Sequence, residues 1–110
     1  RVKLPDVPDS LRARRHQAAA YSAALADIAE PPHQAPGMRH AFRNFVMHAD
    51  HRDALRAGLA RRGVSSAMPY APPLHLQPVY AARGFGPGAF PVTERSARRL
   101  LGLPLGPHLE

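Results

Sequence analysis

Residues 70–109, YAPPLHLQPVYAARGFGPGAFPVTERSARRLLGLPLGPHL, combine a proline-rich start, a glycine-rich middle and a leucine-rich end. Pro72, Pro73 and Pro78 restrict the backbone, so we expect an extended and rigid path here. A short helical turn is predicted to follow over residues 77–82. This part of the stretch therefore reads as a rigid connector between regular elements.

The second half of the stretch predicts a loop, a helix and a strand. Residues 84–88 contain three glycines and a proline, which is the composition of a loop. Residues 90–101 suit a helix, because a proline stands in its first turn, a glutamate lies early and two arginines lie late. Residues 103–105 suit a short strand, and Pro104 favours its placement at an edge of the sheet.

Upstream, the spacing of apolar residues predicts one long helix. They recur at intervals of seven, three, four and three, at Leu11, Ala18, Tyr21, Leu25 and Ile28. Asp6 and Asp9 are candidates to cap its start, and Pro31 and Pro32 require it to end near Ala29. The apolar stripe is narrow, so we expect this helix to lie along a domain boundary with one side in water.

A strand, a helix and a second strand are predicted next, after a proline-rich loop. Residues 41–48 suit a strand, and residues 52–62 suit a helix that Asp50 caps and Gly63 ends. Residues 64–68 suit another short strand. The sequence therefore predicts an α+β fold, a small and mostly antiparallel sheet covered by helices.

Length and composition agree with one small unit. We expect residues 1–110 to form a single domain, with residues 1–30 as a long N-terminal helix region. Apolar residues make up 45% of the chain, but many are alanine and no tryptophan is present. The core should therefore be modest, unless another domain or subunit covers one face.

The net charge of +7 comes almost entirely from arginine, which supplies fourteen of the fifteen basic residues. These arginines are spread over three predicted helices and mixed with acidic residues, and no aromatic residues alternate with them. This favours solvated helix faces over a surface for an anionic ligand or an acidic partner, and it argues against a nucleic-acid partner. No long apolar run and no signal-peptide pattern appear, so we expect a cytoplasmic protein without a membrane partner.

Seven histidines raise the question of a metal site. His48 and His51 have an HxxH spacing, but a strand end followed by a helix start does not hold both rings on one face. The chain has no cysteine, and no third ligand lies nearby in sequence. We therefore predict no metal site.

His75 lies between a proline pair and the predicted helical turn, where its ring should be held in place. One interpretation is structural, with the ring hydrogen-bonded to loop backbone. Tyr70 precedes it and offers either a hydroxyl for a ligand or simple packing. The residues alone leave these alternatives open.

Several residues of this region stand in an order that resembles a known family. They are Tyr70, Pro73, Leu74, His75, Gln77, Tyr80, Gly84, Phe90, Pro91, Glu94, Leu103, Pro104 and Pro107. Together they resemble the C-terminal end of the DegT/DnrJ/EryC1/StrS family, which are sugar aminotransferases dependent on pyridoxal phosphate. Upstream, Arg52, Asp53 and Leu55, followed by Gly63 and Val64, are similar to a helix and strand entry of that family. Residues 1–4 resemble the segment just after the family's substrate-domain linker.

The resemblance implies the C-terminal small domain of a fold-type I enzyme. The parent enzyme would move an amino group from an amino acid, often glutamate or glutamine, to a nucleotide-linked keto sugar, and would be a homodimer. A missing N-terminal domain would hold pyridoxal phosphate. His75 and Tyr70 would then lie at the edge of the substrate cleft between the two domains.

The family binds its cofactor through a lysine imine, and the only lysine of this chain is Lys3. The context of Lys3 resembles no cofactor site, so we expect no catalytic and no cofactor-binding residue in these 110 residues, and no activity from them alone. The alternative is a stand-alone binding or interaction module derived from such a domain. Leu109 and Glu110 fit a remnant of a tag.

Two positions depart from the family pattern. Pro69 stands where the family commonly has a histidine before the tyrosine, and Arg43 stands where it commonly has another. Both differences remove polar groups near the expected cleft edge. They imply a different choice of substrate or a degraded activity.

Overall fold

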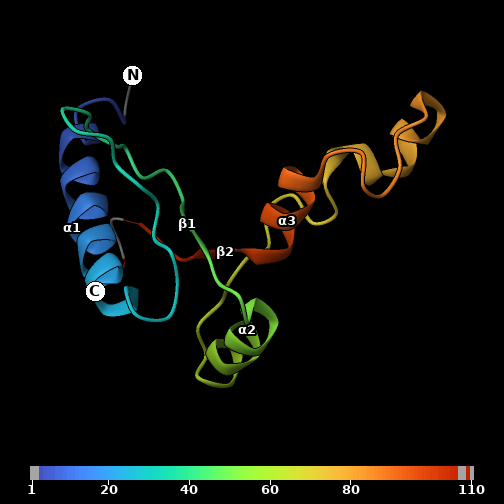
Figure 1. Cartoon of the computed structure of the whole chain (residues 1–110). Coiled ribbons are helices and arrows are strands. Elements are labelled where there is room, and N and C mark those ends of the chain that lie inside the picture. Colours follow the sequence, from blue (N-terminus) through green and yellow to red (C-terminus); the bar gives the residue numbers. More distant parts are fainter. Residues whose placement is uncertain (1–2, 107–108, 110) are drawn as a thin grey trace.

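The computed structural model describes residues 3–106 and residue 109. Its elements, in chain order, are α1 (Val7–Leu25), β1 (Phe45–His48), α2 (Arg52–Arg61), the 3-10 helices η1 (Leu74–Leu76) and η2 (Pro78–Arg83), α3 (Pro91–Arg99) and β2 (Leu100–Leu103). Figure 1 shows the two strands crossing the middle of the molecule, with the helices around them. The fold is α+β with a small antiparallel sheet, as the sequence predicted.

The sheet consists of β1 and β2, paired along their full lengths. The paired residues are Phe45 with Leu103, Val46 with Gly102, Met47 with Leu101, and His48 with Leu100. A single residue extends the sheet on each side, since Glu30 bridges to His48 and Ala67 bridges to Gly102. Both bridges are held by two backbone hydrogen bonds of 2.8–3.0 Å. Four segments distant in sequence therefore meet at one small sheet.

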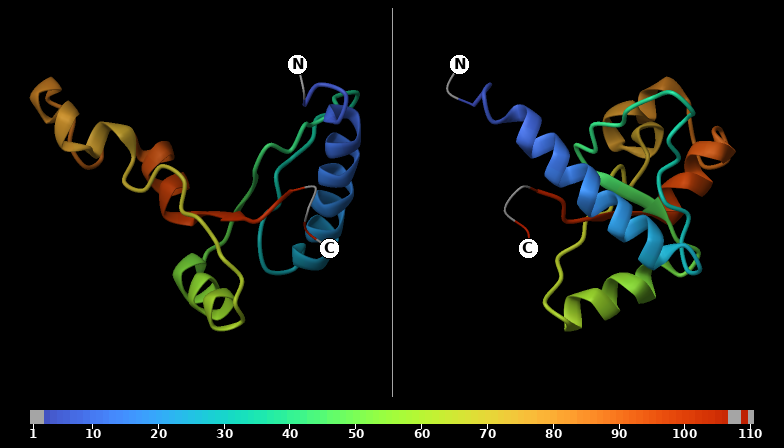
Figure 2. Two further views of the ribbon diagram at one scale, coloured as in Figure 1. Left: turned by 180° about the vertical axis from the view of Figure 1, so that it is seen from behind. Right: turned by 90° about the vertical axis from the view of Figure 1, so that its left-hand side faces the viewer.

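One face of this sheet forms the core. Phe45, Met47 and Leu101 are fully buried, and they share a face because alternate side chains of a strand point the same way. The residues that pack around them come mainly from α1 and α2, and are Ala18, Tyr21, Leu25, Ala29, Phe42, Leu55, Leu59, Leu103 and Leu105. Figure 2 shows α1 lying across the sheet on this side. The first helix therefore packs through the middle of the predicted stripe, Ala18, Tyr21 and Leu25, whereas Leu11 and Ile28 lie outside the core.

Side-chain hydrogen bonds fasten the end of the chain to α1. Gln17 donates to the carbonyl oxygens of Gly106 and Leu109, at 2.9 and 2.7 Å, and accepts from the Gly106 amide. The Tyr21 hydroxyl donates to the Pro104 carbonyl at 3.0 Å. These bonds hold the segment after β2 against the helix that covers the core.

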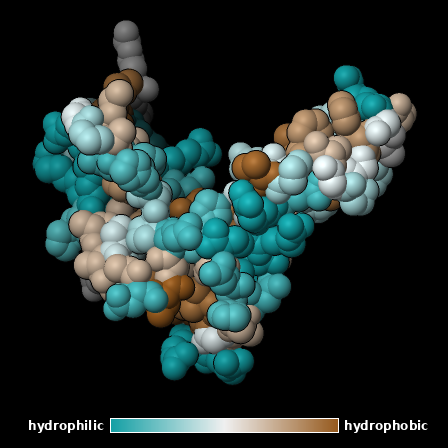
Figure 3. Space-filling model, viewed as in Figure 1, coloured by the Kyte–Doolittle hydropathy of each residue, from teal (hydrophilic) through white to brown (hydrophobic). Residues whose placement is uncertain are grey.

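A long arm, residues 70–94, projects from the sheet and makes the molecule elongated. The arm comprises η1, η2, the glycine-rich loop and the start of α3, and Figures 1 and 3 show it extending away from the body. The radius of gyration is 16.4 Å, whereas a compact chain of this length would have about 13 Å. The arm exposes large apolar side chains, among them Val79, Phe85 and Phe90.

Several predicted strand boundaries were wrong. Residues 41–44 are not in a strand, because Phe42 takes a left-handed conformation with φ of 45° and the chain turns there. The expected strand over residues 64–68 pairs only at Ala67. The last strand begins at Leu100 instead of Leu103, because pairing with β1 extends the backbone directly after α3.

The helix ends also differ from the prediction in two places. α1 ends at Leu25, four residues earlier than expected, and Ile28 is 60% exposed. Asp50 does not cap α2, since the cap residue is His51 and the Asp50 carboxylate pairs with Arg99. Gly63 has φ of 75° and ends α2 as predicted. Arg1, Val2, Pro107 and Glu110, on which parts of the resemblance and the tag prediction depend, lie outside the described residues.

Candidate functional site

His75 and Glu94 form a buried pair inside the arm. The amides of Leu76 and Gln77 donate to the carbonyl oxygens of Pro73 and Leu74, and this short turn orients the His75 ring toward α3. The ring Nε2 lies 3.1 Å from Glu94 Oε1. Only 8% of the His75 side chain and 11% of the Glu94 side chain is exposed. The ring is therefore held in place, as predicted, but by a carboxylate instead of loop backbone.

The same oxygen of Glu94 accepts two backbone hydrogen bonds. The amide of Gly88 donates at 2.8 Å and the amide of Phe90 at 3.3 Å. Phe90 is the cap residue of α3, so the carboxylate satisfies one of the amides that a helix start leaves without a partner. Burial opposes the ionisation of Glu94, but the hydrogen bonds from His75, Phe90 and Gly88 outweigh it and lower the pKa of the carboxyl.

Aromatic packing completes this cluster. The His75 ring meets the Phe90 ring edge to face, with centroids 4.9 Å apart, and Phe85 lies 5.2 Å from Phe90. His75 therefore contacts both the helix start and its carboxylate. Glu94 carried part of the family resemblance but was not predicted as a site residue, because a glutamate early in a helix is explained by the helix dipole alone.

Tyr70 lies on a different part of the arm from the His75 and Glu94 pair. It takes a left-handed conformation with φ of 56°, and it is 68% exposed. With Leu74, Val92 and other residues of η1 and α3, it lines a hollow of about 360 Å³, and His75 does not line this hollow. The two predicted site residues thus lie on one arm but do not face a common space in this chain.

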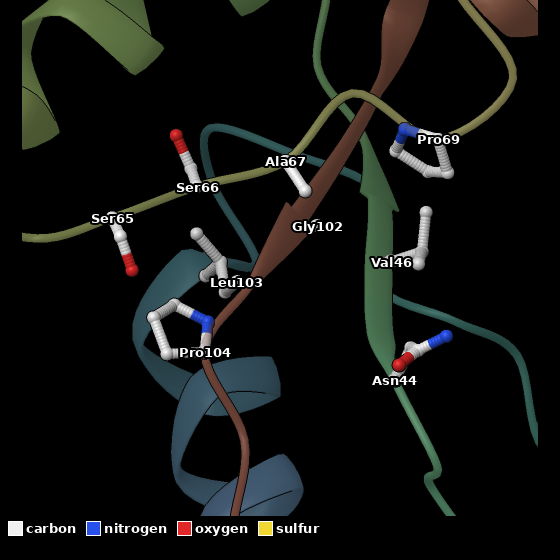
Figure 4. Close-up of a pocket in the computed structure, with 9 residues that line it drawn as sticks. All are labelled: Asn44, Val46, Ser65, Ser66, Ala67, Pro69, Gly102, Leu103 and Pro104. Atoms are coloured by element: carbon white, nitrogen blue, oxygen red, sulfur yellow. The ribbon is translucent and has the colours of Figure 1, made fainter.

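A second hollow, of about 320 Å³, lies beside the sheet (Figure 4). It is lined by Asn44, Val46, Ser65, Ser66, Ala67, Pro69, Gly102, Leu103 and Pro104. Pro69, one of the two departures from the family pattern, lies at its edge in Figure 4. The amide and hydroxyl groups suit neutral hydrogen-bonding ligands. No local pattern predicts this hollow, because its walls come from three separate segments.

A polar network joins α3 to the end of the sheet where His48 lies, away from the hollow of Figure 4. His48 Nε2 lies 2.8 Å from the Ser96 hydroxyl, and Arg99 pairs with Glu30 at 2.8 Å and with Asp50 at 2.7 Å. The hydrogen bond to Glu30, working against burial, raises the pKa of Arg99, so this guanidinium stays charged. Arg99 is therefore an anchor of α3 and not a solvated surface residue.

The described residues offer neither a metal cluster nor a membrane helix. Across residues 3–106 and 109, no three side chains of the His, Cys, Asp and Glu types gather where they would hold a metal ion. Within the same part of the chain, no helix has the length and apolar character needed to cross a membrane.

Pyridoxal phosphate does not fit the residues present here. Its imine requires an amine in a site that excludes water, and Lys3, the only lysine, is exposed in the turns before α1. An arm hydrogen-bonded by His75 and Glu94 can shape one side of a ligand cleft, but it supplies no such amine.

Comparison with known proteins gives consistent results over the whole chain. The model of the DegT/DnrJ/EryC1/StrS aminotransferase family matches residues 1–110. The erythromycin biosynthesis sensory transduction protein EryC1 of Saccharopolyspora erythraea is 39% identical over 99% of this chain. The dTDP-3-amino-3,4,6-trideoxy-alpha-D-glucose transaminase of Streptomyces venezuelae is 37% identical over 100% of it.

A solved structure matches equally well. The crystal structure of S. venezuelae DesV in complex with a ketimine intermediate superposes with a TM-score of 0.92, at 34% identity over 99% of this chain. The chain spans about 30% of the length of that protein and of both curated relatives.

Proposed function

Because the chain belongs to the DegT/DnrJ/EryC1/StrS aminotransferase family, we propose that it is the C-terminal small domain of an aminotransferase that acts on a nucleotide-linked keto sugar. The parent enzyme would take the amino group from an amino acid. It would use pyridoxal phosphate, which supplies the imine chemistry of amino transfer when bound. The cofactor lysine would come from a preceding domain, because Lys3 of this chain does not fit that role.

The observation that carries this proposal is the match to a transaminase of a dTDP-linked sugar over 100% of the chain at 37% identity. A second relative, the UDP-N-acetyl-3-dehydro-alpha-D-glucosamine 3-aminotransferase of Acidithiobacillus ferrooxidans, is 32% identical over 99% of the chain. Both names describe sugars carried on a nucleotide. We therefore place the substrate of the parent in the same class.

In this proposal the arm covers the substrate side of the cleft. Tyr70 is exposed beside an apolar hollow, where its hydroxyl can reach a ligand, whereas His75 is buried and acts by fixing the arm. The net charge of +7 would draw an anionic nucleotide toward the cleft. We place the parent in the cytoplasm as a homodimer.

The experiment uses the full-length parent with pyridoxal phosphate, glutamate or glutamine as amino donor, and a panel of dTDP- and UDP-linked keto sugars. Mass spectrometry of the sugar product measures amino transfer. We expect transfer by the parent and none by the 110-residue chain alone. No transfer to any nucleotide-linked sugar, with full loading of the cofactor, would refute the proposal.

The second candidate is a binding or interaction module without its own chemistry. The elongated shape and the exposed apolar side chains of the arm favour it, since such side chains in a soluble protein often mark a contact surface. A natural reading frame that starts just before Arg1 would support the module. A frame that continues upstream through a lysine-bearing cofactor domain would support the enzyme.

A further inference from the structure

We propose that Glu94 is the positioning residue that fixes the arm for substrate binding, by tying η1, the glycine-rich loop and the start of α3 to one carboxylate oxygen. The inference deepens the proposed function and rests on it. It assigns a role to a residue that the sequence analysis did not select.

The geometry places three donors around one atom. His75 Nε2, the Gly88 amide and the Phe90 amide lie 3.1, 2.8 and 3.3 Å from Glu94 Oε1. They belong to η1, to the loop that follows η2, and to the cap of α3. With Glu94 ionised, all three groups donate, and hydrogen bonds to a charged acceptor are the stronger kind. Loss of this one oxygen would release three segments together.

Glu94 is itself held by the body of the protein through α3. Two residues further along, Ser96 lies 2.8 Å from the His48 ring on β1. Arg52 of α2 donates to the Ala97 carbonyl at 2.8 Å, so the helix is tied to a second element as well. The carboxylate is therefore a fixed point relative to the sheet, and it transmits that position to the arm.

The arm has almost no apolar core to hold it otherwise. Of the residues between 70 and 94 whose burial the structure describes, only Pro73 and Glu94 are buried as whole residues, and the side chain of His75 is buried as well. Leu74, Val79 and Phe85 are more than two-fifths exposed. Since apolar burial supplies most of the stability of ordinary elements, an arm without it depends on its hydrogen bonds. Among those bonds, the one between His75 and Glu94 links parts of the arm that are 19 residues apart, and those from Gly88 and Phe90 tie the glycine-rich loop and the helix cap to the same oxygen.

The arm also carries the residue that we place at the substrate. Tyr70 lies directly before the proline segment that leads into η1, and its hollow is walled by η1 on one side and α3 on the other. The distance between these two walls is set by the His75 and Glu94 contact. Release of that contact would widen the hollow and weaken substrate binding, without moving the chemistry supplied by the other domain.

The test compares Glu94→Ala and Glu94→Gln in the full-length parent, with Asp9→Asn as the control. Asp9 also accepts a side-chain hydrogen bond, from Arg12, but it lies on α1, so its variant removes a carboxylate away from the arm and from α3. Hydrogen exchange read by mass spectrometry reports the opening of residues 84–90 and, separately, of β1 and β2. Steady-state kinetics give KM for the nucleotide sugar and kcat.

We expect Glu94→Ala to speed exchange in residues 84–90 by about tenfold or more, with the strands within about twofold of wild type. KM for the sugar should rise by about tenfold, and kcat should fall by less than about threefold, because the lost contact affects binding. Glu94→Gln should recover most of both effects, since its amide oxygen can still accept from the same three donors. Asp9→Asn should match wild type in the arm.

Unchanged exchange in residues 84–90 would overturn the proposal, and so would a fall in kcat at constant KM. If Glu94→Ala does not fold, as faster exchange in β1 and β2 would reveal, then His75→Ala, which removes one of the three donors, is compared with Glu94→Gln, which keeps the acceptor, by the same two readouts. A wild-type parent that is inactive on every nucleotide sugar would refute the proposed function and the substrate role. The exchange data would still decide whether Glu94 fixes the arm.

Discussion

Replacement of Phe45 by alanine should remove most of the stability of this chain. The Phe45 side chain is fully buried, and its ring lies 5.2 Å from Tyr21 and 6.4 Å from Phe42. An aromatic side chain buries about 150–250 Å², which at about 25 cal/mol per Å² corresponds to roughly 4–6 kcal/mol as an upper bound. Core replacements of this kind cost about 3–5 kcal/mol, and small domains have only about 5–15 kcal/mol in total.

The neighbouring residue provides a matched control. Val46 follows Phe45 on β1 but points to the opposite face, where it is half-buried and lines the hollow of Figure 4. Its replacement by alanine should cost about 1 kcal/mol, because a smaller apolar surface is lost and the hollow already gives access to water. The two variants differ in which face of the strand they affect.

The assay is urea unfolding of the 110-residue chain, followed by its helical circular dichroism. We expect the unfolding midpoint of Phe45→Ala to fall far below that of Val46→Ala, with both slopes close to wild type. Equal losses from the two variants, or a loss below about 1 kcal/mol for Phe45→Ala, would refute the placement of the core on that face.

Three further outcomes are expected. The 110-residue chain mixed with pyridoxal phosphate and purified should show no absorbance band of an internal imine, and a stoichiometric band lost in Lys3→Ala would contradict this. His75→Ala in the parent should lower kcat/KM for the nucleotide sugar, mainly through a higher KM, without a comparable loss of melting temperature, and destabilisation alone would leave His75 a purely structural residue. Because the pKa of Glu94 is lowered in the folded state, its contribution to the arm should be complete above the ordinary value of 4.5 and be lost as the pH falls through the lower folded value. Exchange of residues 84–90 measured against pH should show this loss in wild type, and Glu94→Gln should lack it.

The predicted helices were located more accurately than the strands. The stripe from Ala18 to Leu25 does face the core, and Gly63 does end α2 in a left-handed conformation. Both signals are local, because a helix places its apolar residues by short-range spacing and a glycine relaxes one backbone position. The expected strand over residues 64–68 was wrong because its pairing depends on Gly102, far along the chain.

The candidate site was predicted only in part. The proline pair before His75 and the helical turn after it correctly indicated a fixed ring, but not the partner of that ring. Glu94 stands 19 residues further on, and only the return of the chain from the glycine-rich loop brings its carboxylate to the ring. The left-handed conformation of Tyr70 was likewise unpredicted, since an isolated tyrosine carries no signal for it.

The sequence by itself determined the α+β composition, the rigid proline path, the family to which the order of residues belongs and the lack of a suitable cofactor lysine. Backbone restriction, apolar periodicity and the presence or absence of an amine are properties that each residue carries into any structure. The tertiary structure decided which residues pair across β1 and β2, which face of the sheet forms the core, and which carboxylate holds the arm. Those features depend on contacts between segments that are distant in the chain. Such contacts form only when their favourable free energy exceeds the entropy lost in closing the long loops between them, and this balance depends on the whole chain.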